Sequence, residues 1–517
     1  MKITYATMSM DNEELQGALD RGAETIRTEV LGNDHPLLID GDEVWTEDRF
    51  AEHSPIDRTI VVGRYSQAGP EHVDAAVTAA AAFGDEWEAT PWSERVAIMR
   101  KAADLMEERT PELAALVSYE VGKSRLEALG GVAEAVEFLR YYSAQMERHD
   151  GFVIELGSLG PDEKNVSILR PYGVWAVISP FNFPMALSAG PSIGALVTGN
   201  TVVLKPSNTG ALAGLEFARL MADAGLPSGA LHVVTGGDET GATLVRHRGV
   251  DGITFTGSYA VGMEIYKEFA TDAPKPTVIE MGGKNPTIVT ATADLDEAAE
   301  GVMRAGFGFS GQKCSACSRV YVERPVYDEF VERLVNLTEN LTLGDPLERS
   351  TFTGPVIDEE AVDRYRRAIE EVGRRDGRIL AGGDIPQGGL FDRGTYVTPT
   401  VVEVDEDSYL WTEEQFLPFL VIAPVDGLDE ATEKANDTVF GLTAGLFSTD
   451  DDEIERFFRD IEAGTTYVNR RAGATTGAWP DIQSFGGWKG SGSSGAGGGG
   501  PWYLRSYMRE QSRTRIG

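Results

Sequence analysis

The strongest constraint on the fold is a regular alternation of short apolar segments and helical segments between about Val174 and Ile279. The apolar segments are rich in β-branched residues and are bounded by Gly, Pro or Ser, which predicts buried strands. Their sequences are VWAVIS, TVVLKP, LHVVTG, GITFTG and TVIEMGG. The segments between them, such as GALAGLEFARLMADAG and YAVGMEIYKEFA, carry apolar residues at helical spacing. Strand–helix units of this length predict a doubly wound parallel sheet, which belongs to the α/β class.

A second alternating series starts at Asn285 and predicts a second α/β domain. Its expected strands are PTIVTA, RVYVER, YVTPTVV, FLVIAPV and TTYVNR. Two domains also suit the length, because 517 residues exceed what one hydrophobic core normally supports. Helices are expected across 67–148, and the glycine-rich segment 490–500 is expected to be a loop before a final strand over 503–514.

Three turns of the first series place small or basic residues where its strands end. VTGGDETG and FTGSYAVG put glycines at the start of helices, where backbone N–H groups can receive a pyrophosphate. LKPSN puts Lys205 at a strand end, and ligands of open α/β sheets bind at that edge. Neither glycine turn has the G-x-G-x-x-G pattern, so each alone is explained equally well as a tight turn. Together the three turns favour a nucleotide site.

Both cysteines of the chain lie in one segment, FGFSGQKCSACSR, as Cys314 and Cys317. The spacing allows a zinc or redox pair, or one nucleophile with an incidental neighbour. Zinc normally takes four ligands and no second pair exists, while a thioredoxin-like motif needs a small βαβ context that is not evident here. The residues favour a single nucleophile without excluding the pair. Cys317 is then expected to be a buried packing residue.

The charge balance argues against several classes of partner. The chain has 82 acidic and 46 basic residues, a net charge of −36, which repels nucleic acid and anionic lipid. The acids are dispersed, which favours a solvated surface suited to high salt over a cation-binding tract. No signal peptide or membrane span is expected, and two cysteines point to a reducing compartment, so a cytoplasmic protein is predicted.

Several longer motifs occur in the order and spacing of the NAD(P)-dependent aldehyde dehydrogenase superfamily, which the chain resembles from about Leu38 onward. They are ISPFNFP (178–184), VVLKPS (202–207), FTGS (255–258), IEMGGKNP (279–286), the cysteine segment, ANDTVFGLTAGLFS (435–448) and SFGGWKGSG (484–492). The resemblance implies a homo-oligomer that uses NAD or NADP on a small-molecule aldehyde. It implies a Rossmann-type dinucleotide-binding domain over 1–148 and 166–282, a catalytic α/β domain over 283–487, and a small β oligomerisation element over 149–165 and 488–517.

The resemblance also assigns roles to individual residues. Cys314 matches the nucleophile, Glu280 the general base and Asn182 the oxyanion amide, and no metal is implied. The cofactor positions fall on Ser179, Lys205, Ser207, Asn208, Gly241, Gly257, Ser258, Gly262, Gly282, Glu414 and Phe416. Two departures leave the choice between NAD and NADP open: Asn208 stands where the superfamily usually has Glu, and Leu417 replaces a glycine in EQFLP.

The likeness extends to one branch of the superfamily, which oxidises L-glutamate γ-semialdehyde (the open form of 1-pyrroline-5-carboxylate) to glutamate in proline breakdown. The segments similar to that branch are 119–142, 469–487 and 499–512. Its carboxylate-binding positions fall on Ser315, Gly477 and Ala478, its flanking aromatics on Phe183 and Phe485, and the partner of the substrate ammonium on Glu134. The alternatives are oxidation of succinic or 2-oxoglutaric semialdehyde, or a catalytically silent binding protein. Retention of all three catalytic residues argues against the silent protein.

Overall fold

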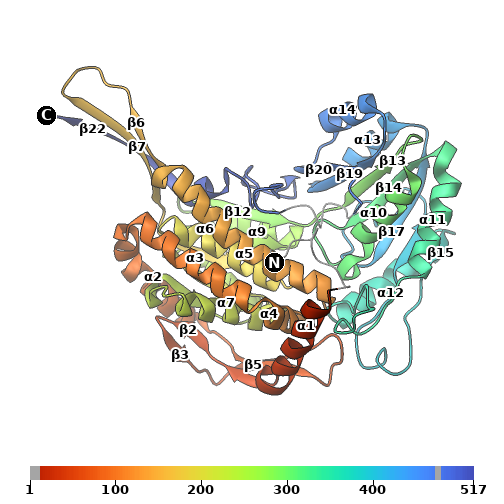
Figure 1. Cartoon of the computed structure of the whole chain (residues 1–517), viewed down its shortest axis with the longest axis horizontal. Helices are drawn as coiled ribbons and strands as arrows, with labels where there is room; N and C mark the ends of the chain where they lie inside the picture. Colours follow the sequence, from red (N-terminus) through yellow and green to blue (C-terminus); the bar gives the residue numbers. More distant parts are fainter. Residues whose placement is uncertain (1–11, 472–478) are drawn as a thin grey trace.

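The computed structural model describes residues 12–471 and 479–517. Two α/β bodies lie side by side, and a thin β arm projects from the first (Figure 1). Buried apolar residues of both bodies, such as Trp175 and Val421, belong to one continuous core. The bodies are therefore packed firmly together.

The first body is built on a seven-stranded sheet with the order β12–β11–β8–β9–β10–β2–β3. Its parallel strands are β8 (Val174–Ile178), β9 (Thr201–Lys205), β10 (Leu231–Val233), β11 (Gly252–Gly257) and β12 (Thr277–Met281). The doubly wound sheet predicted from the alternation is confirmed. Two antiparallel strands, β2 (Leu37–Ile39) and β3 (Asp42–Val44), extend it at one edge, and the alternation did not predict them.

The helices of the first body are α1 (Glu13–Thr25), α2 (Pro70–Ala89), α3 (Trp92–Glu108), α4 (Thr110–Val121), α5 (Arg125–Arg148), α6 (Pro184–Val197), α7 (Ala211–Asp223), α8 (Asp238–Arg246) and α9 (Tyr259–Glu268). The helices expected across 67–148 are confirmed as α2 to α5. Helix α4 ends at Gly122, whose φ of 77° lies in the left-handed region that favours glycine. A small sheet of β1 (Asn33–His35), β4 (Arg49–His53) and β5 (Val61–Ser66) lies beyond them.

The second body has its own seven-stranded sheet, in the order β15–β16–β17–β14–β13–β19–β20. Its strands are β13 (Asn285–Val289), β14 (Cys317–Glu323), β15 (Arg378–Ala381), β16 (Thr400–Glu403), β17 (Phe419–Val425), β19 (Thr443–Phe447) and β20 (Thr465–Val468). Its helices are α10 (Leu295–Phe307), α11 (Tyr327–Glu339), α12 (Glu359–Arg374), α13 (Leu428–Asn436) and α14 (Asp451–Asp460). The second α/β domain is confirmed, although YVTPTVV is a strand only from Thr400, and β15 and β19 were not predicted.

The arm is a three-stranded antiparallel sheet of β6 (Val153–Leu156), β7 (Glu163–Pro171) and β22 (Met508–Ile516). The prediction of a strand from residue 503 is wrong for its first part. Residues 503–507 form a 3₁₀ helix, because Tyr503 and Tyr507 are buried against the body and the Tyr507 hydroxyl donates to Tyr503. The predicted domain boundary at 165 falls inside β7.

The strand order locates the expected binding edge. After β10 the chain crosses back to form β11 on the other side of β8, so the order reverses between β8 and β11. Ligands of open α/β sheets bind at the carboxyl ends of the strands beside such a reversal. Only three residues, 282–284, separate the end of β12 from the start of β13. The carboxyl edge of the first sheet therefore faces the amino ends of β13 and β14, where the cysteine segment lies.

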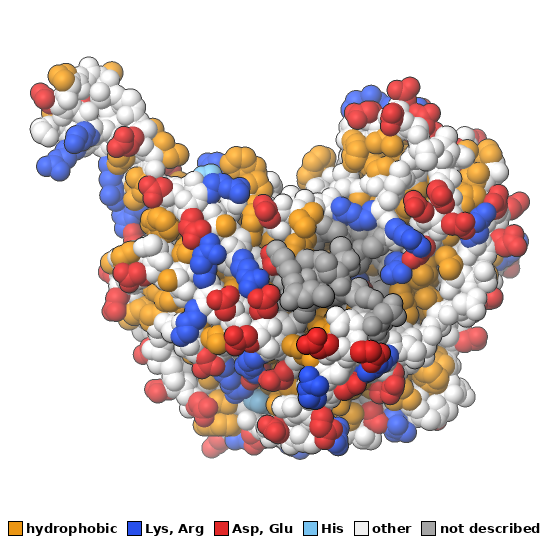
Figure 2. Space-filling view, viewed as in Figure 1, with side chains coloured by type: hydrophobic (Ala, Val, Ile, Leu, Met, Phe, Trp, Pro, Cys, Tyr) orange, Lys and Arg blue, Asp and Glu red, His pale blue; other side chains and the backbone are white. Residues whose placement is uncertain are grey.

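The surface carries many acidic side chains. On the face shown in Figure 2 they are spread among Lys and Arg over both bodies and form no single patch. None of the described helices has the length and apolar character needed to cross a membrane. Within 12–471 and 479–517, no group of three or more His, Cys, Asp or Glu side chains is arranged to hold a metal ion.

Candidate active site

Cys314 lies in a tightly held loop between α10 and β14. Earlier in this loop, Phe309 and Ser310 have φ of 52° and 53°, a left-handed conformation that is costly for side-chain-bearing residues. Hydrogen bonds fix this conformation: Ser310 Oγ donates to the Gly354 carbonyl at 2.6 Å, and the Ser310 N–H donates to Thr353 Oγ1 at 2.9 Å. Such stored strain is typical of functional sites, where the surroundings over-determine one backbone path.

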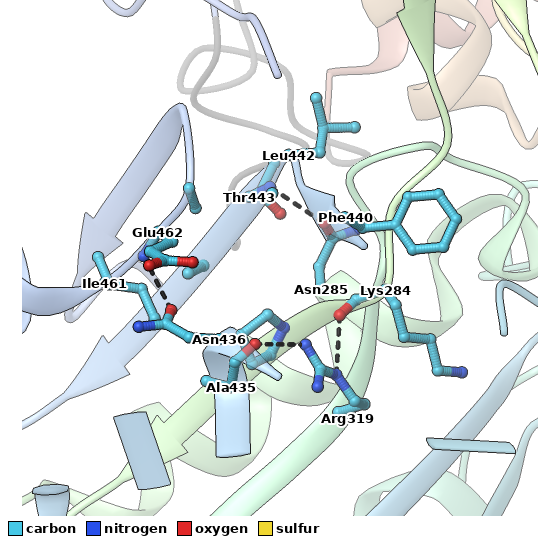
Figure 3. Close-up of a pocket in the computed structure, with 14 residues that line it drawn as sticks. Lys284, Asn285, Arg319, Ala435, Asn436, Phe440, Leu442, Thr443, Ile461 and Glu462 are labelled. Atoms are coloured by element: carbon cyan, nitrogen blue, oxygen red, sulfur yellow. Dashed lines mark hydrogen bonds between the residues drawn. The ribbon is translucent and has the colours of Figure 1, made fainter. Parts of the chain in front are cut away.

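Asn285 anchors the cysteine segment from the start of β13. Its Nδ2 donates to the Cys314 carbonyl at 2.7 Å and to the Ala316 carbonyl at 2.9 Å, while its Oδ1 accepts from the Thr443 N–H at 3.0 Å. Figure 3 shows the Asn285–Thr443 bond, together with the bonds from Arg319 to the carbonyls of Lys284 and Ala435. The sequence analysis missed Asn285, whose place in IEMGGKNP was its only signal.

Glu280 lies at the carboxyl end of β12. The outer edge of this strand is covered by the glycine-rich segment: the Met281 N–H donates to the Ser491 carbonyl at 2.8 Å and the Ser493 N–H to the Ile279 carbonyl at 3.0 Å. Glu280 Oε1 is buried and has no hydrogen-bond partner in the described part of the chain. Burial raises the pKa of Glu280 well above its ordinary value, and the Gly487 N–H opposes this only in part. A raised pKa suits a general base at neutral pH.

The surroundings of Cys314 raise the pKa of its thiol above the ordinary value. Desolvation raises its pKa most, the carboxyls of Glu280 and Glu414 add to the effect, and the Ser315 N–H opposes it. Attack on a carbonyl therefore requires the thiol to lose its proton first, and among the carboxyls Glu280 raises the pKa of that thiol most.

Cys317 is a packing residue on β14, as predicted. Only 3% of it is exposed, and it belongs to an apolar cluster with Val289 and Phe307. Both cysteines are free. Burial raises the pKa of Cys317 to about 11, which makes it a poor nucleophile.

Asn182 lies in the turn between β8 and α6, at the sheet edge beside the order reversal. The residue is 3% exposed. Ser179 holds the start of the turn: its N–H donates to the Lys205 carbonyl at 3.1 Å, and its hydroxyl lies 2.8 Å from that of Ser188 on α6. Phe181 meets Phe416 edge-to-face, with ring centroids 5.8 Å apart, so the turn also contacts the EQFLP segment.

The donors at the end of β9 fit a dinucleotide. Lys205 is 7% exposed, and its Nζ donates to the neighbouring Pro206 carbonyl at 3.3 Å. Burial lowers its pKa to about 8, and Asp238 opposes this. Asn208 Oδ1 is buried without a partner among the residues described. A buried cation and an orphaned amide oxygen beside the Ser207 hydroxyl are suited to the phosphates and hydroxyls of a nucleotide.

The predicted cofactor glycines lie where backbone and helix approach closely. A Cβ at Gly241, in the first turn of α8, would lie 3.5 Å from Lys205 Cε. A Cβ at Gly262 would lie 2.6 Å from Met281 Cγ, so glycine lets α9 pack on β12. Gly257 ends β11, and Ser258 caps α9 by accepting from the Val261 N–H at 3.4 Å.

Glu414 lies across the link between the two sheets. Its Oε1 accepts from the Gly283 N–H at 2.9 Å, and a Cβ at Gly282 would overlap its carboxyl. Burial raises the pKa of Glu414 to about 7, against the same N–H and Lys284. Phe416, two residues on, has a φ of 55°. Glu414 thus lies against the segment that directly follows Glu280.

Four of the predicted substrate residues lie near the predicted catalytic residues. Glu134 on α5, Glu280 and Phe485 line one pocket. Phe183 follows Asn182, and Ser315 follows Cys314 and is 7% exposed. Gly477 and Ala478 lie outside the described residues.

The sequence analysis also missed a buried lysine in this region. Lys123 Nζ lies 3.3 Å from the centre of the Phe183 ring. Burial raises the pKa of Glu134 to about 7, and the charges of Lys123 and Lys313 oppose that rise. Glu134 therefore lines the pocket within electrostatic range of two buried lysines, and a few polar groups of this kind orient a polar substrate.

Comparison with known proteins decides the family. Residues 44–512 match the model of the Aldehyde dehydrogenase family. The chain belongs to the aldehyde dehydrogenase family. The resemblance inferred from the motifs is thereby confirmed, and with it an NAD(P)-dependent enzyme.

Individual relatives match this aldehyde dehydrogenase over nearly its whole length. It is 38% identical over 494 residues to the 1-pyrroline-5-carboxylate dehydrogenase of Geobacillus sp. (strain WCH70), with 94% of each chain covered. It is 38% identical over 501 residues to 1-pyrroline-5-carboxylate dehydrogenase 2 of Bacillus subtilis (strain 168), with 95% of this chain and 94% of the relative covered. A structure of 1-pyrroline-5-carboxylate dehydrogenase from Thermus with bound NAD is 36% identical, with a TM-score of 0.93 and 98% of each chain covered.

Proposed function

We propose that this enzyme oxidises L-glutamate γ-semialdehyde to glutamate with NAD⁺ or NADP⁺. The observation that carries the proposal is the pocket in which Glu134 and Phe485 lie with the buried base Glu280. An aldehyde that bears an ammonium group needs a carboxylate partner at a fixed distance from the base and nucleophile. The names of the near full-length relatives support the same substrate.

In this proposal the Cys314 thiol loses its proton to solvent and the sulfur adds to the aldehyde carbon. The Asn182 side chain and the Cys314 N–H receive the oxyanion, and losing one such donor typically costs roughly 10²–10³ in rate. The bound nicotinamide supplies the hydride acceptor that leaves an acyl group on the sulfur. Glu280 then takes a proton from the water that hydrolyses this thioester. The cofactor would be held by Lys205, Ser207, Asn208, Gly241, Gly257, Ser258, Gly262 and Glu414.

Substrate choice tests the proposal. We expect glutamate γ-semialdehyde to exceed hexanal in kcat/KM by up to roughly 10⁴-fold, because buried donors are left unpaired by an analogue without polar groups. The sharpest comparison is 2-oxoglutaric semialdehyde, which replaces the amino group by a keto group. Glu134→Gln should reduce the ratio of kcat/KM for glutamate γ-semialdehyde to that for 2-oxoglutaric semialdehyde. Ser315→Ala should lower kcat/KM for both of these substrates and leave that for hexanal nearly unchanged. A native preference for succinic or 2-oxoglutaric semialdehyde would refute the substrate and leave the family chemistry intact.

Asn208 is proposed to relax discrimination against NADP⁺. A carboxylate at this position would repel a 2′-phosphate, whereas a neutral amide can donate to it. We expect the native enzyme to reduce both cofactors, and Asn208→Glu to raise the KM for NADP⁺ by about tenfold, with little change for NAD⁺. Initial rates with each cofactor measure this. Strict use of NAD⁺ by the native enzyme, unchanged in the variant, would place the selectivity elsewhere.

The arm is proposed to join copies of this chain into a homo-oligomer. Its strands expose apolar side chains, including Val153, Ile154 and Leu156, which are 43%, 62% and 46% exposed. The outer edge of β22 is also free of any described strand. A long exposed edge and apolar surface are typical of association sites.

The acidic surface is proposed to suit a salt-rich cytoplasm. At 0.01 M salt the Debye length is about 30 Å, so like charges repel one another across much of the molecule. Added salt screens this repulsion, and the melting temperature should rise as KCl increases from dilute to molar. Thermal unfolding at a series of KCl concentrations measures this. A flat response would mean that the net charge of −36 has no bearing on stability.

A further inference from the structure

A buried carboxyl from a distant helix supplies the missing cap of α7. Gly210 is the N-cap residue of α7 and has no side chain to accept its first N–H groups. Glu120, on α4 and 0% exposed, takes that role: its Oε1 accepts from the Leu212 N–H at 2.6 Å and from the Ala213 N–H at 3.2 Å. Buried helix termini need such a partner, so Glu120 fixes where α7 begins.

The start of α7 supports two parts of the catalytic region at once. A Cβ at Gly214 would lie 2.8 Å from Pro206, so the helix packs directly on the segment 205–209 that carries Lys205 and Asn208. A Cβ at Gly210 would lie 3.0 Å from Pro184, next to the turn that carries Asn182. Any shift of the first turn of α7 therefore moves both the proposed cofactor segment 205–209 and the turn that carries Asn182.

We propose that Glu120 is a positioning residue for the dehydrogenase reaction: it clamps the N-terminus of α7 and thereby holds segment 205–209 in the geometry that binds the dinucleotide. Glu120 is not one of the proposed catalytic, cofactor-binding or substrate-binding residues. The inference rests on the proposed cofactor site and adds a residue that the family motifs did not single out.

The surroundings of Glu120 predict which substitutions it tolerates. A second buried carboxyl, Glu52, interacts with it, and neither Glu52 oxygen has a hydrogen-bond partner in the described chain. The other titratable groups that act on this pair are Glu216, which acts on Glu120, and Tyr65, which acts on Glu52. Burial raises the pKa of both carboxyls above their ordinary values. The Leu212 and Ala213 N–H groups need a hydrogen-bond acceptor at this position, so an uncharged acceptor of the same length should replace Glu120.

Binding to the full-length apo-enzyme tests the proposal. NADH and NAD⁺ titrations, followed by NADH fluorescence and by calorimetry, should show about tenfold weaker binding in Glu120→Ala, because two buried N–H groups lose their acceptor. Glu120→Gln should bind within about threefold of native, since its amide oxygen still accepts. The matched control is Glu216→Gln, on the same helix, which removes ion pairs to Arg109 and Arg219 without touching the first turn.

Steady-state kinetics distinguish a positioning role of Glu120 from an effect on stability alone. In Glu120→Ala the KM for the dinucleotide should rise more than kcat falls, while Glu216→Gln lowers the melting temperature and leaves binding unchanged. Native-like dinucleotide binding by a folded Glu120→Ala would overturn the proposal. If that variant does not fold, Glu120→Asp decides, because a side chain one methylene shorter should weaken binding where Glu120→Gln does not. Native enzyme that binds no dinucleotide would refute the proposed cofactor site itself.

Discussion

Cys314→Ser should abolish dehydrogenase activity, lowering kcat by roughly 10⁴-fold or more. A serine hydroxyl is a far weaker nucleophile than a thiolate, and the single buried carboxyl of Glu280 cannot ionise it. The loop itself should stay intact, because its conformation is held by Asn285, Ser310 and Thr353 and not by the sulfur. Steady-state NADH production and the melting temperature measure the two effects separately.

The matched control is Cys317→Ser, three residues away. Its sulfur packs in the core of the second body and donates weakly to the Arg319 carbonyl at 3.6 Å. We expect activity within about threefold of native and a stability loss of about 1–2 kcal/mol. Equal loss of activity in both variants, restored by reductant or by metal, would revive the pair hypothesis.

Glu280→Gln should separate the two halves of the reaction. The first turnover should still release about one equivalent of reduced cofactor, while steady-state turnover falls by roughly 10²–10⁴-fold, because an amide cannot activate water. Rapid mixing followed by NADH absorbance measures both phases. The absence of any burst would mean that Glu280 is required earlier, for activation of Cys314.

The pH dependence of turnover tests the same role of Glu280 as the general base. The base must be deprotonated to act, and burial raises the pKa of Glu280 well above its ordinary value. The native turnover rate should therefore fall as the pH drops through that raised pKa and recover above it. In Glu280→Gln this limb should disappear from the slow phase. An unchanged limb in the variant would assign it to another group, such as Glu414.

Much of the fold could be predicted because its strands are marked locally. The buried strands of both sheets are apolar runs bounded by Gly, Pro or Ser, so periodicity alone located β8, β9 and β11. The β2–β3 extension carries no such signal: its strands are short, and pairing with β10 across the sheet defines them. Likewise Tyr503 and Tyr507 gave a strand-like pattern, but burial against the body turned that segment into a 3₁₀ helix.

The candidate site was predicted through motifs. The motifs do not reveal the hydrogen bonds that hold the site residues in place. Cys314, Glu280 and Asn182 carry the recognisable chemistry. Asn285 and Glu120 act through hydrogen bonds to backbone groups 29–31 and 92–93 positions away, respectively. No local pattern encodes which distant N–H or carbonyl a buried polar side chain will meet. Only the tertiary structure reveals those partners.

The most direct test of the central claim is to trap the acyl group on the enzyme. The Glu280→Gln enzyme is mixed with NAD⁺ and L-glutamate γ-semialdehyde and the reaction is quenched in acid. The protein is then digested, and the masses of its peptides are measured by mass spectrometry. We predict a glutamyl adduct on Cys314, with Cys317 unmodified and no adduct when NAD⁺ is omitted. An adduct on Cys317, no adduct despite a burst of NADH, or more efficient trapping from 2-oxoglutaric semialdehyde would contradict the claim.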